Sequence, residues 1–182
     1  RYSQKTGAPL FERFEKVWVY SVVTDFNKSI GYNNLNYGFD IQYNLVNSSA
    51  NEGTPSRYAD GGSDMSSFSI FSQYKYPFGK SSYLSGGMRY SKIILNADFL
   101  DTETYNLPFD RIQLDNDAIT GSLGLFYQLQ KEWEASAAIS SGFRSPNVDD
   151  VTKVFAKSGT VTVPNKDLTP EYSYNAEFTI SK

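Results

Sequence analysis

Histidine and cysteine are both missing from the 182 residues of this chain. Without cysteine, the chain has no disulfide framework and no thiolate metal site. Without histidine, it lacks the usual general base and the commonest metal ligand, and catalytic triads that use an imidazole are excluded. We therefore predict that the chain is not an enzyme and that it holds no metal ion and no cofactor.

Long apolar runs and an excess of basic residues are also missing. No stretch approaches the roughly 18 apolar residues that a membrane-spanning helix requires. The net charge is -3 and the isoelectric point is near 5.0. Because a nucleic-acid partner calls for a basic stripe, we predict no nucleic-acid partner. The first ten residues are polar and unlike a signal peptide, so we expect either that the front of a precursor was removed or that the sequence begins partway along.

Aromatic residues are abundant, at 16% of the chain, with 14 Tyr and 13 Phe. The mean hydropathy is nevertheless negative, at -0.45. Residues 31–45 show how a chain rich in aromatic residues can have a negative mean hydropathy, since apolar Leu35, Phe39 and Ile41 alternate with polar Asn36 and Asp40. A period of two held over about eleven residues predicts a strand with one apolar and one hydrated face. Its length suits a tilted membrane span, which needs about 9 to 11 residues.

The same alternation recurs along the chain and predicts seven antiparallel strands. Phe71 interrupts it by lying on a polar side, and the first strand has valines on both sides. The strands are expected near residues 13–25, 31–45, 66–76, 82–95, 118–129, 133–143 and 172–182.

The connections alternate between short turns and long loops. Short turns are expected at 26–30, 77–81 and 130–132, and long loops at 46–65, 96–117 and 144–171. This alternation is typical of the periplasmic turns and extracellular loops of outer-membrane barrels. Aromatic residues expected near the short turns suit an interfacial girdle; they are Tyr20, Phe26, Tyr76, Phe78, Tyr127 and Trp133.

The fold class predicted from these patterns is all-β, an antiparallel up-and-down segment of a transmembrane β-barrel in contact with outer-membrane lipid. A soluble β-rich binding module is the alternative, since alternating strands are also routine in β-sandwiches. The polar side of the strands is thin in Leu, Ile and Val and would not pack a dry core, so we favour the membrane wall.

Two short motifs in the last long loop carry a family resemblance. Gly142-Phe143-Arg144-Ser145-Pro146-Asn147 and Pro164-Asn165-Lys166-Asp167-Leu168-Thr169-Pro170-Glu171 resemble the paired boxes of TonB-dependent outer-membrane receptors. Ser145 stands where the family commonly has Ala, and Lys166 where Pro is frequent. The matching residues are Phe143, Arg144, Pro146, Asn147, Pro164, Asn165, Leu168, Pro170 and Glu171.

The resemblance implies a bacterial outer-membrane transport receptor with a plugged barrel of about 22 strands. Such a receptor takes up a scarce nutrient, siderophore-iron or a similar chelate, with energy from the TonB system. Seven strands would then be about a third of the wall, and we expect the plug domain and the contact with TonB to lie outside this sequence. A small self-contained outer-membrane barrel with an adhesive or structural role remains an alternative.

Haem is a further ligand of some relatives with these boxes, and in them a histidine between the boxes is the expected iron ligand. The absence of any histidine between Phe143 and Leu168 argues against haem here, although tyrosine can also ligate haem iron.

Candidate ligand-binding residues are arginines and aromatics of the long loops, because Arg offers a planar fork of donors and Tyr a rigid amphipathic face. They are Arg57, Tyr58, Tyr105, Phe109, Arg111 and Arg144. The alternative is that they are ordinary solvated loop residues. For the boxes we favour a structural role, in which Pro146 ends a strand and Asn147 satisfies freed backbone groups in a turn. The Asp-rich segments 60–64 and 98–101 lack the spacing of a calcium loop and are expected to be solvated.

Overall fold

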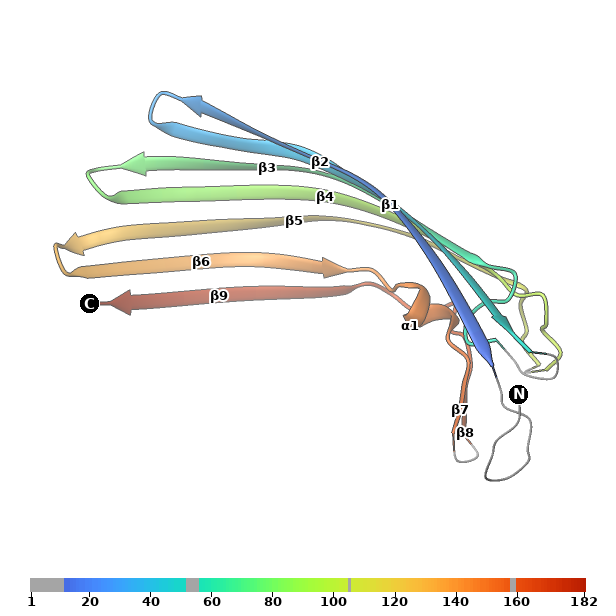
Figure 1. Cartoon of the computed structure of the whole chain (residues 1–182). Coiled ribbons are helices and arrows are strands. Elements are labelled where there is room, and N and C mark those ends of the chain that lie inside the picture. The colour runs from blue at the N-terminus through green and yellow to red at the C-terminus, as the bar shows by residue number, and fades with distance from the viewer. Residues whose placement is uncertain (1–11, 52–55, 105, 158–159) are drawn as a thin grey trace.

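The computed structural model describes residues 12–51, 56–104, 106–157 and 160–182. Seven strands form one antiparallel sheet in the order β1-β2-β3-β4-β5-β6-β9, so that neighbours in the chain are neighbours in the sheet. Figure 1 shows this sheet as a curved wall. The strands are β1 (Arg13–Ile30), β2 (Asn33–Ala50), β3 (Ser63–Phe78), β4 (Ser82–Asp98), β5 (Arg111–Gln130), β6 (Trp133–Arg144) and β9 (Glu171–Ser181).

Cross-strand register carries the alternation of each strand across the whole sheet. Tyr20 lies opposite Tyr43, Ile41 opposite Phe68, and Leu123 opposite Ile139. Directly opposite residues of an antiparallel pair share a face, so these contacts build one continuous apolar face and leave the polar residues on the other. Large side chains of the apolar face are widely exposed. The predicted seven-stranded, up-and-down, all-β architecture is therefore confirmed.

The short connections are tighter than the sequence indicated. β1 and β2 are joined by residues 31–32, β3 and β4 by residues 79–81, and β5 and β6 by residues 131–132. Gly31 and Gly79 have φ values of 62° and 63°, in the left-handed region that glycine enters without a steric penalty. One of the aromatics expected near these turns does not lie there: Tyr20 is in the middle of β1, stacked on Tyr43 at 6.5 Å between ring centroids.

The exception that Phe71 makes to the polar face has a structural reason. Its ring lies over Gly38 of the neighbouring strand, where an added Cβ would be 2.8 Å from the Phe71 ring. The Arg89 guanidinium lies 5.8 Å from the centroid of the same ring and donates to the Asp40 carboxylate at 2.5 Å. The Phe71 ring thus fits on the polar face because Gly38 has no side chain there and because the Arg89 guanidinium, paired with Asp40, lies near the ring.

The strands extend further into the expected long loops than the alternation indicated. The predicted loops 46–65 and 96–117 shrink to residues 51–62 and 99–110, because β2, β3, β4 and β5 continue at their ends. Toward this end of β4 and β5 the pattern inverts: Leu95 and Ile112 are buried on the otherwise polar face, whereas Lys92 and Asp115 form an ion pair on the apolar face. The alternation of apolar and polar residues therefore breaks where the surroundings of the side chains change, although the backbone pairing of the strands continues.

The expected loop 144–171 also contains ordered structure that the sequence did not reveal. It holds a short helix, α1 (Val148–Thr152), and a hairpin of β7 (Phe155–Lys157) and β8 (Thr160–Thr162). Both lie inside the bend of the sheet (Figure 1). In the described part of the chain, no helix has the length and apolar character that crossing a membrane requires.

Candidate functional site

The buried core of the described residues lies at the long-loop end of the wall, on its polar face. Val46, Leu95, Ala97 and Ile112 project there from β2, β4 and β5, and the three long connections cover them. The covering residues are Ala59, Phe99, Val148 and Val151, with Tyr58, Leu107, Phe109 and Leu168 packed against them. The loops are therefore folded over the polar face by apolar burial and do not extend freely from the strands.

Helix α1 is fixed at its start by the first box. The Asp150 N–H donates to Asn147 Oδ1 at 3.0 Å, and the Asn147 N–H donates to Asp150 Oδ2 at 3.1 Å. This reciprocal pair is a capping box, which satisfies two otherwise unpaired donors. The sequence predicted that Asn147 would satisfy freed backbone groups in a turn, and the structure places it at a helix N-cap. Val148, Val151 and Thr152 are buried as a result.

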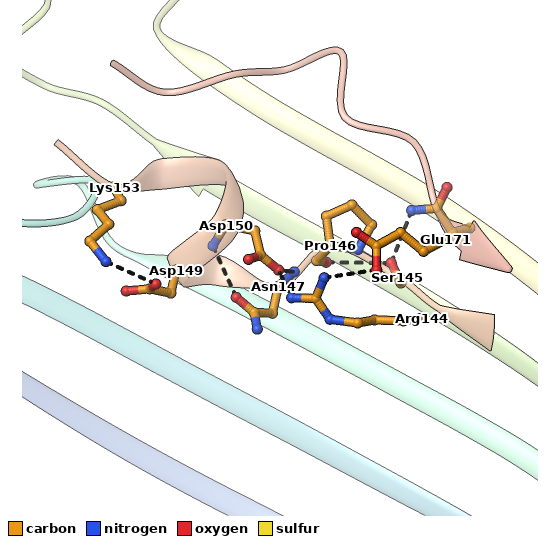
Figure 2. Close-up of polar contacts among 9 residues, drawn as sticks. Arg144, Ser145, Pro146, Asn147, Asp149, Asp150, Lys153 and Glu171 are labelled. Atoms are coloured by element: carbon orange, nitrogen blue, oxygen red, sulfur yellow. Dashed lines mark hydrogen bonds and ion pairs between the residues drawn. The ribbon is translucent and has the colours of Figure 1, made fainter. Parts of the chain in front are cut away.

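Arg144 joins the two boxes (Figure 2). Its guanidinium donates to Asp150 Oδ2 at 2.6 Å and to Glu171 Oε2 at 3.3 Å. The bond to Asp150 raises the pKa of Arg144 further above its already high value. Since Asp150 also closes the capping box, Arg144 holds the end of β6, the start of β9 and α1 in one arrangement. Its side chain is occupied by carboxylates, which leaves less of the guanidinium for an anionic ligand.

The other box residues are mostly architectural in their contacts. Phe143 and Tyr172 lie opposite each other on the apolar face, with ring centroids 5.4 Å apart. Pro146 and Pro164 are buried. Asn165 donates its N–H to the Val151 carbonyl at 3.1 Å, and Leu168 packs against the apolar cluster. Pro170 directly precedes the first residue of β9.

The first and second long loops are joined through Asp60. Its carboxylate accepts the N–H groups of Leu100 at 2.8 Å and Asp101 at 2.9 Å, and Gly61 donates its N–H to the Asp98 carbonyl at 2.9 Å. In the two Asp-rich segments, the Asp60 carboxylate and the Asp98 carbonyl thus accept hydrogen bonds from the protein itself. No group of three or more acidic, histidine or cysteine side chains suited to a metal ion occurs among the described residues.

The first and third long loops are joined through Tyr58. Its hydroxyl donates to Asp149 Oδ1 at 2.7 Å, and the Val154 N–H donates to the Arg57 carbonyl at 2.9 Å. The hydrogen bond from Tyr58 lowers the pKa of Asp149, whereas burial, followed by the bond to Asp149, raises the pKa of Tyr58. Asp149 also accepts from Lys153 at 3.1 Å. Asp149 could not be identified from local sequence order, because its partner Tyr58 is 91 residues away.

Besides Tyr58, the predicted site residues divide into three groups: residues in contact with an aromatic ring, arginines paired with carboxylates, and one residue outside the described part of the chain. Arg57 lies 5.4 Å from the centroid of the Tyr58 ring, and Phe109 makes an edge contact with Phe99 at 6.0 Å. Arg111 is paired with Asp98 at 2.5 Å, and this hydrogen bond lowers the pKa of Asp98. Arg144 is paired as described above, and Tyr105 lies outside the described residues.

A cavity of about 270 Å³ lies where the first two loops and the end of α1 meet. Tyr58, Asp60 and Phe99 line it together with Ser48, Leu107 and Val154. It combines aromatic and aliphatic walls with hydroxyl and carboxylate groups, which is the usual composition of a small-molecule site. Phe109 packs beside this cavity through Phe99, and Arg111 and Arg144 fix the surrounding loops.

A family model and a solved structure are both similar to this chain. The family model described as TonB dependent receptor-like, beta-barrel matches residues 2–181. The structure of a double mutant of the Serratia marcescens hemophore receptor HasR, in complex with its hemophore HasA and heme, is similar with a TM-score of 0.76 at 16% identity. The match covers 93% of this chain and 30% of that receptor, and at this identity it shows the fold alone. No curated protein sequence matches the chain.

Proposed function

The chain belongs to the TonB-dependent receptor β-barrel family, and on this premise we propose that it is part of the wall of a receptor that imports a scarce nutrient. Barrels of this family reside in the bacterial outer membrane and are transporters, not enzymes. The apolar face of the sheet is accordingly the lipid-facing side, and the polar face lines the lumen. A soluble binding module is thereby excluded, and a small self-contained barrel is disfavoured by the family.

The transported ligand that we propose is a siderophore-iron complex or a similar chelate. Energy would come from TonB through a part of the receptor outside this chain, and about 22 strands would complete the wall. The long-loop end would be extracellular, as in other barrels with short periplasmic turns. One observation supports the proposal: the three long loops pack on one another over the lumen-facing side of the wall at its long-loop end, around a cavity.

Within this site, Tyr58 and Phe109 are the proposed contact residues, with Arg57 at the edge for an anionic group. Arg111 and Arg144 would act by holding the loops, because each is already paired with a carboxylate. Tyr105 remains a proposed contact from the sequence. A chelate with aromatic or hydroxamate groups would find both a stacking surface and hydrogen-bond donors here.

Haem is the second candidate, because the HasR structure contains heme. This chain supplies no histidine, and the Tyr58 hydroxyl is bonded to Asp149. An axial ligand for haem iron would have to come from the remainder of the receptor or from a rearranged tyrosine. A preformed iron chelate needs no such ligand, which favours the siderophore proposal.

Binding to the full-length receptor in detergent tests the proposal. A ferric hydroxamate, a ferric catecholate and haem would each be titrated against the native chain and against Tyr58→Ala, with Tyr32→Ala as the control. Tyr32 is 94% exposed in a short turn at the opposite end. We expect one ferric chelate to bind and Tyr58→Ala to weaken it about tenfold, a typical loss for a contacting aromatic, with no change for Tyr32→Ala.

Two results would reject this proposal. Tight binding of haem alone would select the second candidate. Equal affinity of the native and Tyr58→Ala receptors for the bound chelate would show that the fused loops around the cavity are not the binding site.

A further inference from the structure

The lipid-facing side of the wall has a depression where β5 and β6 separate. The ladder between these strands reaches Ser122 and Ser140 and does not continue to the next pair. There the Gly121 N–H donates to Ser141 Oγ at 3.0 Å, and the same hydroxyl donates to the Gly121 carbonyl at 3.4 Å. A side-chain hydroxyl therefore bonds to Gly121 at the position where the backbone of β6 would pair in a regular ladder.

The depression has a volume of about 570 Å³. Cross-strand register places its apolar walls on the lipid-facing side, because Leu123 is opposite Ile139 and Ser141 is opposite Tyr174. Ser122, Ser140 and Asn175 also line the depression, and their side chains belong to the lumen-facing row. Gly121 contributes no side chain, whereas Leu123, Ile139 and Tyr174 stand up around it and remain exposed. Ala176 closes one wall with only a methyl group. Because Gly121 and Ala176 have little or no side chain and lie among the larger side chains of Leu123, Ile139 and Tyr174, the surface forms a groove here.

The chemistry of the groove calls for an apolar occupant. Ser141 is the polar side chain that the floor has on the lipid-facing side, and its hydroxyl both accepts from and donates to the backbone of Gly121. The single donor of this hydroxyl is therefore already used within the protein. A charged or strongly hydrated ligand would lose its water here without compensation.

Polar residues on the same face show where the groove lies in the membrane. Lys92 and Asp115 form an ion pair on the lipid-facing side, and Asp117 lies opposite Lys92, so this row marks the headgroup level. Gly121 is four residues further along β5, or about 13 Å at the rise of a strand. That depth is within one leaflet, since the whole hydrocarbon layer is about 30 Å thick.

We infer that the groove between β5 and β6 holds one acyl chain of a membrane lipid from the leaflet on the long-loop side. The groove is continuous with the lipid-facing surface and lies at acyl-chain depth, so a lipid tail is the occupant it meets. A tail seated against Leu123, Ile139 and Tyr174 buries more of its surface than a tail on a flat wall, and the lipid is retained for longer than its neighbours.

Native mass spectrometry of the full-length receptor during stepwise delipidation in detergent tests this inference. Ala176→Phe fills the groove, and Ala137→Phe is the matched control. Ala137 is on the same face, opposite Leu125 and Phe178, and is not among the residues that line the groove. Loss of contact to only two methylenes corresponds to about a tenfold fall in occupancy.

We expect the native receptor and Ala137→Phe to retain one lipid after the other lipids are removed, and Ala176→Phe to lose it. Ala176→Leu, a smaller filler, gives the same comparison if the phenylalanine variant does not fold. Absence of a retained lipid in the native receptor would overturn the inference, as would equal retention by the filled groove. Loss in both phenylalanine variants would overturn it as well. Chelate uptake is a separate measurement, so either result leaves the proposed transport function to its own test.

Discussion

Val151 is the residue through which the packing of α1 can be measured. It is 0% exposed and belongs to the apolar cluster that joins the helix to the lumen-facing side of the wall. Val151→Ala removes two methyl groups, which costs roughly 2 kcal/mol when the lost transfer energy and the cavity are counted. Because the loss falls on a local contact, it lowers the free energy of opening this segment and leaves the strand ladder unchanged.

Hydrogen exchange of the full-length receptor measures that opening. The Val151 N–H is bonded to the Asn147 carbonyl, and the Asn165 N–H to the Val151 carbonyl. We expect both amides to exchange about 30-fold faster in Val151→Ala, the factor that corresponds to roughly 2 kcal/mol. Val163→Ala is the control, since Val163 is in the same loop and 46% exposed. Unchanged exchange in Val151→Ala, or equal acceleration in the control, would refute the claim that apolar burial holds the loop down.

Two further predictions concern the loops and the wall. The hydrogen bond from Tyr58 lowers the pKa of Asp149, so its stabilisation is present above about pH 4 and is lost as pH falls through the lowered value. Exchange in α1, corrected for the intrinsic rate, should rise on acidification, and Tyr58→Phe should flatten this rise; a flat native profile contradicts the assignment. Gly38→Val should lower the folded yield, seen as heat-modifiable mobility on gels, because a Cβ there would lie 2.1 Å from a carbonyl oxygen of β1 and 2.8 Å from the Phe71 ring. Gly86→Ala, whose Cβ meets nothing nearer than 3.7 Å, should fold normally, and equal yields would contradict the steric argument.

The fold of the wall was largely predictable because strand alternation is a local property. The side chains of Leu35, Phe39 and Ile41 share a face whatever their neighbours are, since successive residues of a strand point to opposite sides. The same rule failed above the lipid-facing band. There Leu95 and Ile112 turn toward a cover of loops, and the apolar and polar faces exchange roles.

The candidate site was only partly predictable, because its contacts join distant parts of the chain. Tyr58 and Phe109 were proposed from residue type alone. The pairing of Arg144 with Asp150 and Glu171 and the bond from Tyr58 to Asp149 were not. These contacts change the role of the arginine, since a guanidinium that is paired with carboxylates holds loops together and has less capacity to bind an anion.

The sequence by itself determined the antiparallel wall, the two faces of that wall, and the paired boxes that indicate the family. Each of these is written in neighbouring residues, by a period of two or by a short motif. Only the tertiary structure decided that the three long loops close over one end, and that β5 and β6 part at Gly121 to leave a groove toward lipid. Those features depend on which residues meet after folding, and burial and hydrogen bonding between such residues have no signature in local sequence order.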